Sequence, residues 1–480
     1  MLTKHSKVKI VTLILKDFCW NFSTFDKEVA MKQIILMRHG MSIGNERKII
    51  QGQLDYGLSE TGIEKLSNEK FTELKNITNI YSSDLSRAYQ SAEIVRDIIQ
   101  HQKPILICES LRENGAGILE GKTKEYCSRE LPEYYQTYLK RGDYDSILEA
   151  EKWIENQARV LIILSQYIDK TDFNDLMVSH AAFIRTFVNM VKLRDRNTQF
   201  NIPDGSIHFL PDPLRKLNIE KYSIAKSSVV HKIGCYDNDY IIKQKEEQLS
   251  SKDYFEYDLL KYLSQYMKIP QIIKMANTSQ GQTKVLQYFN GIHKFGNLNE
   301  KDTKTLLETV GILNKHLQNY EHQNIEDGSI INDLNYIISR LYSEDALIEA
   351  KNLLSDSSFR NYLNDCKKCL VHNDLHRSNI LINNDEVYLL DFENIKRYPS
   401  DLQLATLLCS SFLLEDPNCN IDSLIDKWPI KIDCVNLKKL IKYRLLYGLA
   451  FFENKIKSED FDESDLELQK KYMRVLRRKK

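Results

Sequence analysis

The 480-residue chain lacks an excess of charge of either sign, because 67 lysine and arginine residues balance 67 aspartate and glutamate residues. A protein that binds nucleic acid or an acidic membrane surface usually carries a basic excess. Long apolar runs are missing too, since no stretch approaches the roughly 18 residues that a membrane-spanning helix needs. We therefore expect neither a nucleic-acid partner nor a membrane partner.

Paired cysteines are also lacking. The chain has nine cysteines, an odd number scattered through a long sequence, and this usage is typical of reduced thiols in a cytoplasm. Cys366 and Cys369 form the one Cys-x-x-Cys pair, and a zinc site would need a second pair at suitable spacing. We therefore predict a cytoplasmic location, with no disulfide framework and no structural zinc.

The pattern of apolar residues predicts two domains. From Met31 to about residue 215, short apolar runs alternate with amphipathic stretches, which favours an α/β domain with a largely parallel sheet. Short alternating runs at 223–291 indicate a small β-rich lobe, and 292–480 is mostly helical in pattern. We expect one domain at 31–215 and a two-lobed α+β domain at 216–480. Residues 1–30 are interpreted as a leader, with Met31 as an alternative start.

A first catalytic signature is Arg38-His39-Gly40, which directly follows the apolar run 34–37. Removing a phosphoryl group without a metal requires a nucleophile, cations for the phosphate oxygens and an acid for the leaving oxygen. A histidine can be the nucleophile, and the planar guanidinium of an arginine suits two phosphate oxygens. A lone Arg-His-Gly occurs by chance in many chains, so the interpretation depends on further elements.

Four such elements follow, and their order resembles that of the histidine phosphatase superfamily from about residue 32 to 210. They are Asn45 with 51–52 and 58–62, then 82–88, then 111–121, and finally 178–185. The resemblance implies a three-layer α/β/α fold and a phosphatase that needs no cofactor. It also implies His39 as the nucleophile, Glu113 as the proton donor, and phosphate binding by Arg38, Asn45, Arg87 and His180.

This superfamily includes mutases as well as phosphatases. Acid phosphatases and phytases continue the motif as Arg-His-Gly-x-Arg-x-Pro, whereas Ser42 and Gly44 stand in those places here. Glu113 and His180 are 67 positions apart, which is shorter than the inserts of the mutases. We favour a phosphatase of small phosphomonoesters over a mutase. The segment 126–145, expected to line the pocket, is aromatic and charged and leaves the substrate open.

A second signature begins at His372 and is typical of the opposite reaction, the addition of a phosphoryl group. It contains Asp374 and Asn379, five positions apart, and Asp391 follows the strand-like run 387–390. Phosphoryl transfer from a nucleotide needs a carboxylate near the acceptor hydroxyl, oxygen ligands for magnesium and a lysine on the phosphates. Asp374 fits the catalytic base, and Asn379 and Asp391 fit the metal ligands.

Residues from about 223 to 412 resemble the aminoglycoside phosphotransferase and choline kinase family. The resemblance implies a bilobal, protein-kinase-like α+β domain that uses Mg²⁺ and ATP or another nucleoside triphosphate. It makes Lys243 the phosphate-binding lysine and Glu256 its helix partner, and it puts Gln287 and Tyr288 in the hinge beside the adenine. Two departures are Asn373, where the family has glycine, and the loop 225–230, which contains no glycine.

The acceptor of the second site is expected to be small. Nine residues separate Asp391 from Asp401, which leaves no room for the activation loop of a protein kinase. We predict a bifunctional enzyme that acts on a small phosphorylated metabolite and a small hydroxyl acceptor (a sugar, polyol or amino alcohol) of one pathway. One hypothesis is phosphate relocation between two positions of a sugar or polyol. The alternative is an active phosphatase with a kinase-like regulatory or binding module.

Overall fold

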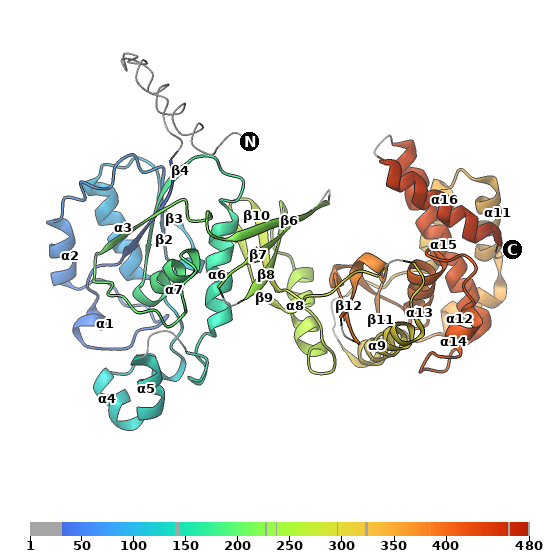
Figure 1. The fold of residues 1–480 in the computed structure, drawn as a ribbon, viewed down its shortest axis with the longest axis horizontal. Helices are drawn as coiled ribbons and strands as arrows, with labels where there is room; N and C mark the ends of the chain where they lie inside the picture. Colours follow the sequence, from blue (N-terminus) through green and yellow to red (C-terminus); the bar gives the residue numbers. More distant parts are fainter. Residues whose placement is uncertain are drawn as a thin grey trace, which may run out of the picture. The chain divides into compact units, whose positions relative to one another are not determined.

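The computed structural model describes residues 31–139, 144–225, 228–236, 238–294, 296–321, 325–383, 385–458 and 461–478. The chain divides into two compact units, whose elements are labelled in Figure 1. The first unit contains the chain up to Trp153 and residues 167–216, and the second contains residues 154–166 and 217–480. The leader expected at 1–30 lies outside the described residues.

The first unit is built on a five-stranded sheet in the order β3-β2-β4-β1-β5. The strands are β1 (Lys32–Arg38), β2 (Asn79–Ser82), β3 (Leu106–Ile107), β4 (Phe173–Ser179) and β5 (Ile207–Pro211). All neighbours pair in parallel except β5, which runs antiparallel to β1. The register sets Arg38 opposite Ser179, so the residues that follow β1 and β4 meet at one edge of the sheet.

Helices cover both faces of this sheet. Those that pack on it are α2 (Glu60–Ser67), α3 (Ser86–Ile98) and α7 (Ala181–Val191), while α1 (Ile43–Glu46), α4 (Lys124–Glu130) and α5 (Pro132–Leu139) belong to the same unit. Ile35 and Met37 share an apolar cluster with residues of α2 and α3. Ile34 and Leu36 point to the opposite face because side chains alternate along a strand, and they are fully buried too. The predicted three-layer α/β/α fold is confirmed.

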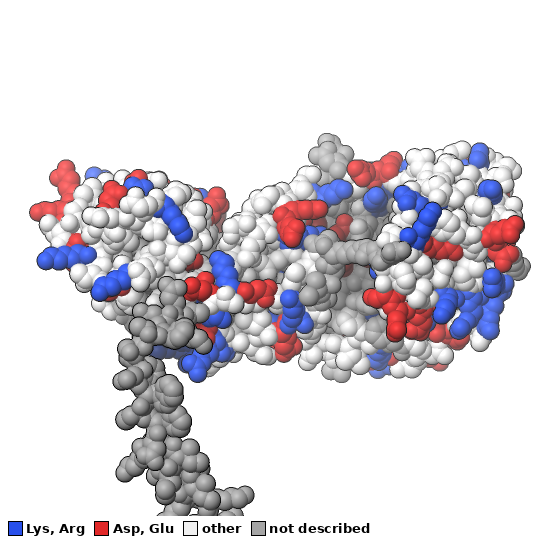
Figure 2. Space-filling model, turned by 90° about the horizontal axis from the view of Figure 1, so that it is seen from above, with Lys and Arg blue, Asp and Glu red and all other residues white. Residues whose placement is uncertain are grey.

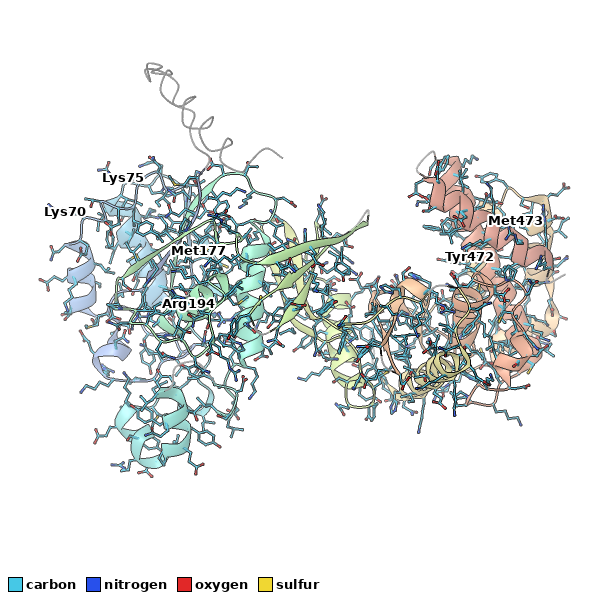
Figure 3. All side chains as sticks on the ribbon, in the orientation of Figure 1. Lys70, Lys75, Met177, Arg194, Tyr472 and Met473 are labelled. Carbon is cyan, nitrogen blue, oxygen red and sulfur yellow. The ribbon has the colours of Figure 1, made fainter. Side chains whose placement is uncertain are left out.

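The side chains of this unit separate into interior and surface as the strand pattern requires. Met177 of β4 is buried in the sheet, whereas Lys70 and Lys75, in the segment that follows α2, are exposed (Figure 3). On the face drawn in Figure 2, basic and acidic side chains are interspersed. That distribution agrees with the balanced composition.

The small lobe of the second unit is an antiparallel sheet in the order β6-β7-β8-β10-β9. Its strands are β6 (Asn218–Ala225), β7 (Ser228–Gly234), β8 (Asp239–Lys245), β9 (Ile272–Thr278) and β10 (Gly281–Gln287), and helix α8 (Ser251–Leu263) follows β8. Tyr240 and Ile242 of β8 are fully buried. Lys243 and Lys245 therefore project from the other face of the strand.

Helix α6 (Trp153–Ser165) falls inside the predicted first domain, yet residues 154–166 cluster with the second unit. The buried hydroxyl of Tyr240 donates a hydrogen bond to the side-chain oxygen of Gln157, which is also buried. Ser279 donates to the side chain of Gln166 over 3.0 Å. A buried hydroxyl needs such a partner, so this segment supplies hydrogen-bond partners to the small lobe.

The larger lobe is mainly helical, as expected. Two short two-stranded sheets pair β11 (Lys368–His372) with β14 (Ile395–Pro399) and β12 (Ile380–Asn383) with β13 (Glu386–Leu389). The helices are α9 (Glu300–Asn319), α10 (Ile330–Arg340), α11 (Glu344–Ser355), α12 (Ser357–Asp365), α13 (Leu402–Leu407), α14 (Ile421–Ile425), α15 (Cys434–Lys457) and α16 (Glu463–Arg478). Gly448 of α15 lies against the ring of Tyr472 in α16, which Figure 3 labels. Among the described residues, no helix is long and apolar enough to cross a membrane.

We expect the substitution Gly62→Ala to destabilise the first unit. A methyl group at Gly62 in α2 would lie 2.0 Å from the carbonyl oxygen of Met41, in the loop that follows His39. Either the helix or the loop must move, which should cost about 2 kcal/mol or more. Urea denaturation followed by circular dichroism measures this loss. Thr61→Ala is the matched control, since Thr61 is exposed in the same helix; equal midpoints for the two variants would contradict the packing argument.

Candidate active sites

The first site is a cavity of about 280 Å³ in the first unit. Five of the predicted residues line it: Arg38, His39, Asn45, Arg87 and Glu113. The sixth, His180, directly follows β4, and its ring centroid lies 5.0 Å from that of His39. The structure thus brings together all the residues that the sequence predicted for this site.

His39 is held as a neutral, oriented ring. Its Nδ1 lies 2.6 Å from the carbonyl oxygen of Gly40, and because a carbonyl can only accept, Nδ1 must carry the proton. Nε2 is then the nitrogen with a free electron pair. Burial, together with the charges of Arg87 and Arg38, lowers the pKa of His39 well below its ordinary value. A neutral imidazole is the form that can attack phosphorus.

The two arginines are fixed by backbone and carboxylate partners. Arg87, which is 1% exposed, donates to the carbonyl oxygens of Gly52 and Leu54, each over 2.9 Å. Arg38 donates to the carbonyl of Ile202 over 2.6 Å and pairs with Asp204 at 2.7 Å. Neutral carbonyl partners leave the charge of Arg87 uncancelled, so the cavity favours an anion.

Asn45 and Glu113 are oriented by backbone bonds. The side-chain oxygen of Asn45 accepts from the backbone N–H and the hydroxyl of Ser42, which leaves the amide N–H groups as donors. Glu113 accepts from the backbone N–H of Ala182 and of Phe183, each over 3.1 Å. Those groups belong to the first turn of α7, where backbone N–H groups lack partners within the helix. The same turn therefore positions His180 and Glu113.

The remaining wall of the cavity comes from residues that the sequence did not single out. The expected aromatic and charged segment contributes Tyr135, Tyr138 and Tyr144, and the rings of Tyr138 and Tyr144 stack at 5.6 Å. Lys124 and Arg185 add positive charge to the same lining. Their distance from His39 in the sequence gave no signal that they would face the same space.

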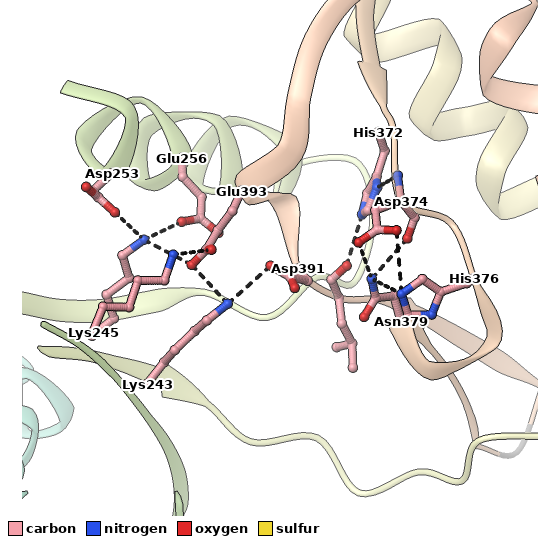
Figure 4. A network of polar contacts seen from close by, with 12 residues as sticks. Lys243, Lys245, Asp253, Glu256, His372, Asp374, His376, Asn379, Asp391 and Glu393 are labelled. Carbon is pink, nitrogen blue, oxygen red and sulfur yellow. Dashed lines mark hydrogen bonds and ion pairs between the residues drawn. The ribbon is translucent and has the colours of Figure 1, made fainter. Parts of the chain in front are cut away.

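The second site centres on the loop after β11, drawn in Figure 4. The side-chain nitrogen of Asn379 donates to the backbone carbonyl of Asp374 over 3.0 Å and to its carboxylate over 3.4 Å. Burial opposes ionisation of Asp374, but the ring of His376, 3.5 Å away, outweighs it and lowers the pKa of Asp374. The predicted base is therefore an ionised carboxylate that can accept a proton from an alcohol.

The oxygen donors at this site suit a magnesium ion. Because the nitrogen of Asn379 is bonded to Asp374, its side-chain oxygen is the atom left for a metal. Asp391 supplies a carboxylate from a left-handed turn, with φ of 60°. Magnesium is usually held by one or two protein carboxylates, with the phosphates of the substrate and water completing the octahedron. The described residues contain no group of three or more histidine, cysteine, aspartate or glutamate side chains that could hold a metal ion.

Lys243 reaches this metal-site carboxylate. Its Nζ lies 3.3 Å from Asp391 and 2.9 Å from Glu393 (Figure 4). The direct ion pair of Glu256 is made with a different lysine, since Lys284 lies 2.7 Å from Glu256. The predicted pairing of Lys243 with Glu256 is thus replaced by pairing with Glu393, a residue that the sequence did not suggest. Burial alone would raise the pKa of Glu393, but the surrounding lysines, Lys243 first, lower it to about 2.

The two predicted hinge residues lie at the end of β10. Gln287 pairs with Tyr240 across the sheet, and the ammonium of Lys232 lies 4.3 Å from the centre of the Tyr288 ring. Both residues line a cavity of about 560 Å³ together with Lys232 and Asn290. Lys243 does not line that cavity.

Two long-range side-chain partners support the loop of the second site. Arg444 of α15 donates to the side chain of Asn373 over 2.9 Å, so the residue in the place of the family glycine is anchored. The backbone N–H of His372 donates to Gln403 over 2.9 Å. The carboxylate of Asp401 accepts a hydrogen bond from the hydroxyl of Tyr362 over 2.9 Å. The sequence missed Arg444 and Gln403 because nothing local marks such distant partners.

Comparison with known proteins assigns the first half of the chain. Residues 34–210 match the histidine phosphatase superfamily (branch 1). Over 153 residues the chain is 30% identical to "Probable phosphoglycerate mutase GpmB" of Yersinia pestis (strain Pestoides F), covering 31% of this chain and 70% of that protein. The chain belongs to the histidine phosphatase superfamily. It is also 28% identical over 182 residues to "Phosphoglycerate mutase-like protein 4" of Arabidopsis thaliana, which covers 37% of this chain and 79% of that protein.

The histidine phosphatase domain is followed by a second family match. Residues 227–413 match the phosphotransferase enzyme family. A solved structure, "Amicoumacin kinase hAmiN in complex with AMP-PNP, Ca2+ and Ami", is 13% identical and covers 54% of this chain and 88% of that chain, with a TM-score of 0.42. The chain therefore consists of a histidine phosphatase domain followed by a phosphotransferase-like domain, as the two signatures predicted.

We expect His39 to titrate below about 6.5, the ordinary value for histidine, because burial and two arginines disfavour its protonated form. The pH dependence of its ring resonances by NMR, assigned by their loss in His39→Ala, gives the midpoint. Arg87→Gln removes one of the cations and should raise the midpoint. A wild-type midpoint at or above 6.5 would contradict the assigned environment.

Proposed function

We propose that the chain is a bifunctional enzyme: a phosphatase that works through a phosphohistidine, joined to a kinase for a small-molecule hydroxyl. The observation that carries the phosphatase is the buried, neutral His39 between Arg38 and Arg87 in a cavity that Glu113 also lines. The kinase is supported by the cluster that joins Lys243 to Asp391. We place both activities in the cytoplasm, on metabolites of one pathway.

In the proposed phosphatase reaction, Nε2 of His39 attacks phosphorus and the bond from phosphorus to the ester oxygen breaks. Glu113 gives its proton to the leaving oxygen. Arg38, Asn45, Arg87 and His180 hold the three phosphate oxygens. Water then attacks the phosphohistidine, Glu113 takes up a proton from it, and inorganic phosphate leaves. A mutase would instead pass the phosphoryl group to a second hydroxyl, so the product separates the two reactions.

The charge of the cavity points to a small phosphomonoester with a second anionic group. Lys124 and Arg185 line it in addition to the two phosphate-binding arginines, and among the described lining residues Glu113 is the one carboxylate. The volume of about 280 Å³ excludes a large organic part. Phosphoglycerate, which the names of the relatives contain, combines a phosphate with a carboxylate and has the expected character.

In the proposed kinase reaction, Asp374 accepts the proton of an acceptor hydroxyl as its oxygen attacks the terminal phosphorus of ATP. Lys243 holds the phosphates of the nucleotide. Asn379 and Asp391 would hold Mg²⁺, which neutralises the charge of the phosphates when it is bound. A sugar, polyol or amino alcohol fits as the acceptor, since Asp391 and Asp401 leave no room for an activation loop.

One observation favours a second candidate for this half. The sequence 225–230 has no glycine, so the backbone cradle that many kinases offer to phosphates is weakened. On that reading, the phosphotransferase-like domain is a regulatory or binding module and the phosphatase alone is active.

Isothermal titration with Mg-ATP separates the two candidates. We expect the wild type to bind, and Asp391→Asn to weaken Mg-ATP binding about tenfold or more because a metal ligand loses its charge. Binding of ATP without magnesium should change less. Asp385→Asn is the control, since Asp385 is an exposed partner of Lys301. If the wild type gives no heat of binding with Mg-ATP, the kinase proposal is wrong.

A panel of candidate metabolites incubated with labelled ATP tests how the two sites relate. Asp374→Ala should reduce phosphoryl transfer by about a thousandfold or more, because transfer loses its base and the orientation of the acceptor. His39→Ala should abolish phosphate release. If the product of the kinase site is a substrate of the phosphatase site, the His39→Ala variant should accumulate a phosphorylated product that the wild type lacks. Without such a product, the hypothesis of phosphate relocation loses support.

A further inference from the structure

The second site contains a lysine that the family motif does not call for. Lys245 lies two residues beyond Lys243 on β8, so both side chains project from the same face of the strand. Both reach one carboxylate: Lys243 lies 2.9 Å from Oε1 of Glu393, and Lys245 lies 2.5 Å from Oε2 (Figure 4). Two ammonium groups are thus gathered beside Asp391, the predicted metal ligand.

A third lysine, Lys284, pairs with the carboxylates of α8, so Lys243 and Lys245 pair with Glu393 instead. Lys284 is 2% exposed and lies 2.7 Å from both Asp253 and Glu256 of α8. It therefore occupies the helix carboxylate that the family resemblance assigned to Lys243. Lys284 also lies 3.5 Å from Oε1 of Glu393. Glu393 would keep this buried counter-charge if Lys243 and Lys245 turned toward another anion.

The sequence near β6 and β7 indicates why a second lysine would be useful at this site. The sequence 225–230 contains no glycine, and glycine is the residue that most easily lets a backbone wrap closely around a phosphate chain. Side-chain cations can make up that loss, because a charge-assisted hydrogen bond to phosphate is about twice as strong as a neutral one. Among the described lysines, Lys245 lies on the same strand as Lys243 and binds the same carboxylate, that of Glu393.

We propose that Lys245 is a second phosphate-binding residue of the nucleotide site and acts side by side with Lys243. Glu393 holds both ammonium groups toward the site until the phosphates of a nucleoside triphosphate replace it. This inference rests on the proposed kinase function and adds a residue to the same site. It predicts that the gain in nucleotide affinity from each additional phosphate depends on both lysines, and not on Lys243 alone.

Isothermal titration with ATP, ADP and AMP tests the proposal on the full-length protein. Lys245→Met should weaken ATP binding about tenfold, as expected for one lost charge-assisted bond, and Lys243→Met should do at least as much. AMP should lose no more than about threefold in either variant, because it lacks the outer phosphates. Lys245→Arg keeps the cation and should restore ATP binding to near the wild-type value. Thermal unfolding verifies that each variant is folded.

The control is Lys268→Met, which removes an exposed lysine paired with Glu386 and should leave all three affinities unchanged. ATP binding by Lys245→Met equal to that of the wild type, with Lys243→Met weakened, would overturn the inference and leave the kinase proposal standing. An equal loss for ATP and AMP would also overturn it, since the effect would then not involve the outer phosphates. Absence of ATP binding by the wild type would overturn both.

Discussion

A cation that is buried beside a phosphate site needs a hydrogen-bonding or ionic partner. The two domains of this chain use different kinds of partner, neutral carbonyls in the first and carboxylates in the second. Arg87 donates from its two terminal nitrogens to two backbone carbonyls, which hold the side chain without cancelling its charge. Lys284 lies against Asp253 and Glu256, which cancel its charge completely. Removing these carboxylates would leave Lys284 as an unpaired buried charge, which is costly, so the lysine arrangement could not tolerate their loss.

This difference fits the chemistry that each site is proposed to perform. A cavity whose arginine keeps a net charge can hold the oxygens of a phosphate without a metal, and the same charge keeps His39 neutral. At the second site, Lys243 is balanced by Asp391 and Glu393, so the cluster does not favour anions as strongly by itself. Magnesium would shift that balance toward a nucleotide, because it adds positive charge next to Asp391.

Local patterns predicted what depends on local sequence. The apolar runs before His39 and His180 predicted two strands that end in catalytic residues, and the parallel register of β1 with β4 brings those ends together. The partner of Lys243 could not be predicted in this way. Lys284 lies on a different strand from Lys243, and a pattern of spacing carries no information about which of two lysines reaches Glu256. Arg444 escaped prediction for the same reason, since 71 residues separate it from Asn373.

Helix α6 shows that a boundary in the sequence need not be a boundary in packing. By family match it belongs to the histidine phosphatase domain, which extends to residue 210. Its Gln157 nevertheless accepts the bond of the buried Tyr240 hydroxyl on β8, the strand that carries Lys243 and Lys245. A fragment that begins at residue 217 would leave that hydroxyl without this partner, at a cost of about 1–3 kcal/mol. The phosphotransferase-like domain therefore depends for part of its own small lobe on a segment encoded before residue 167.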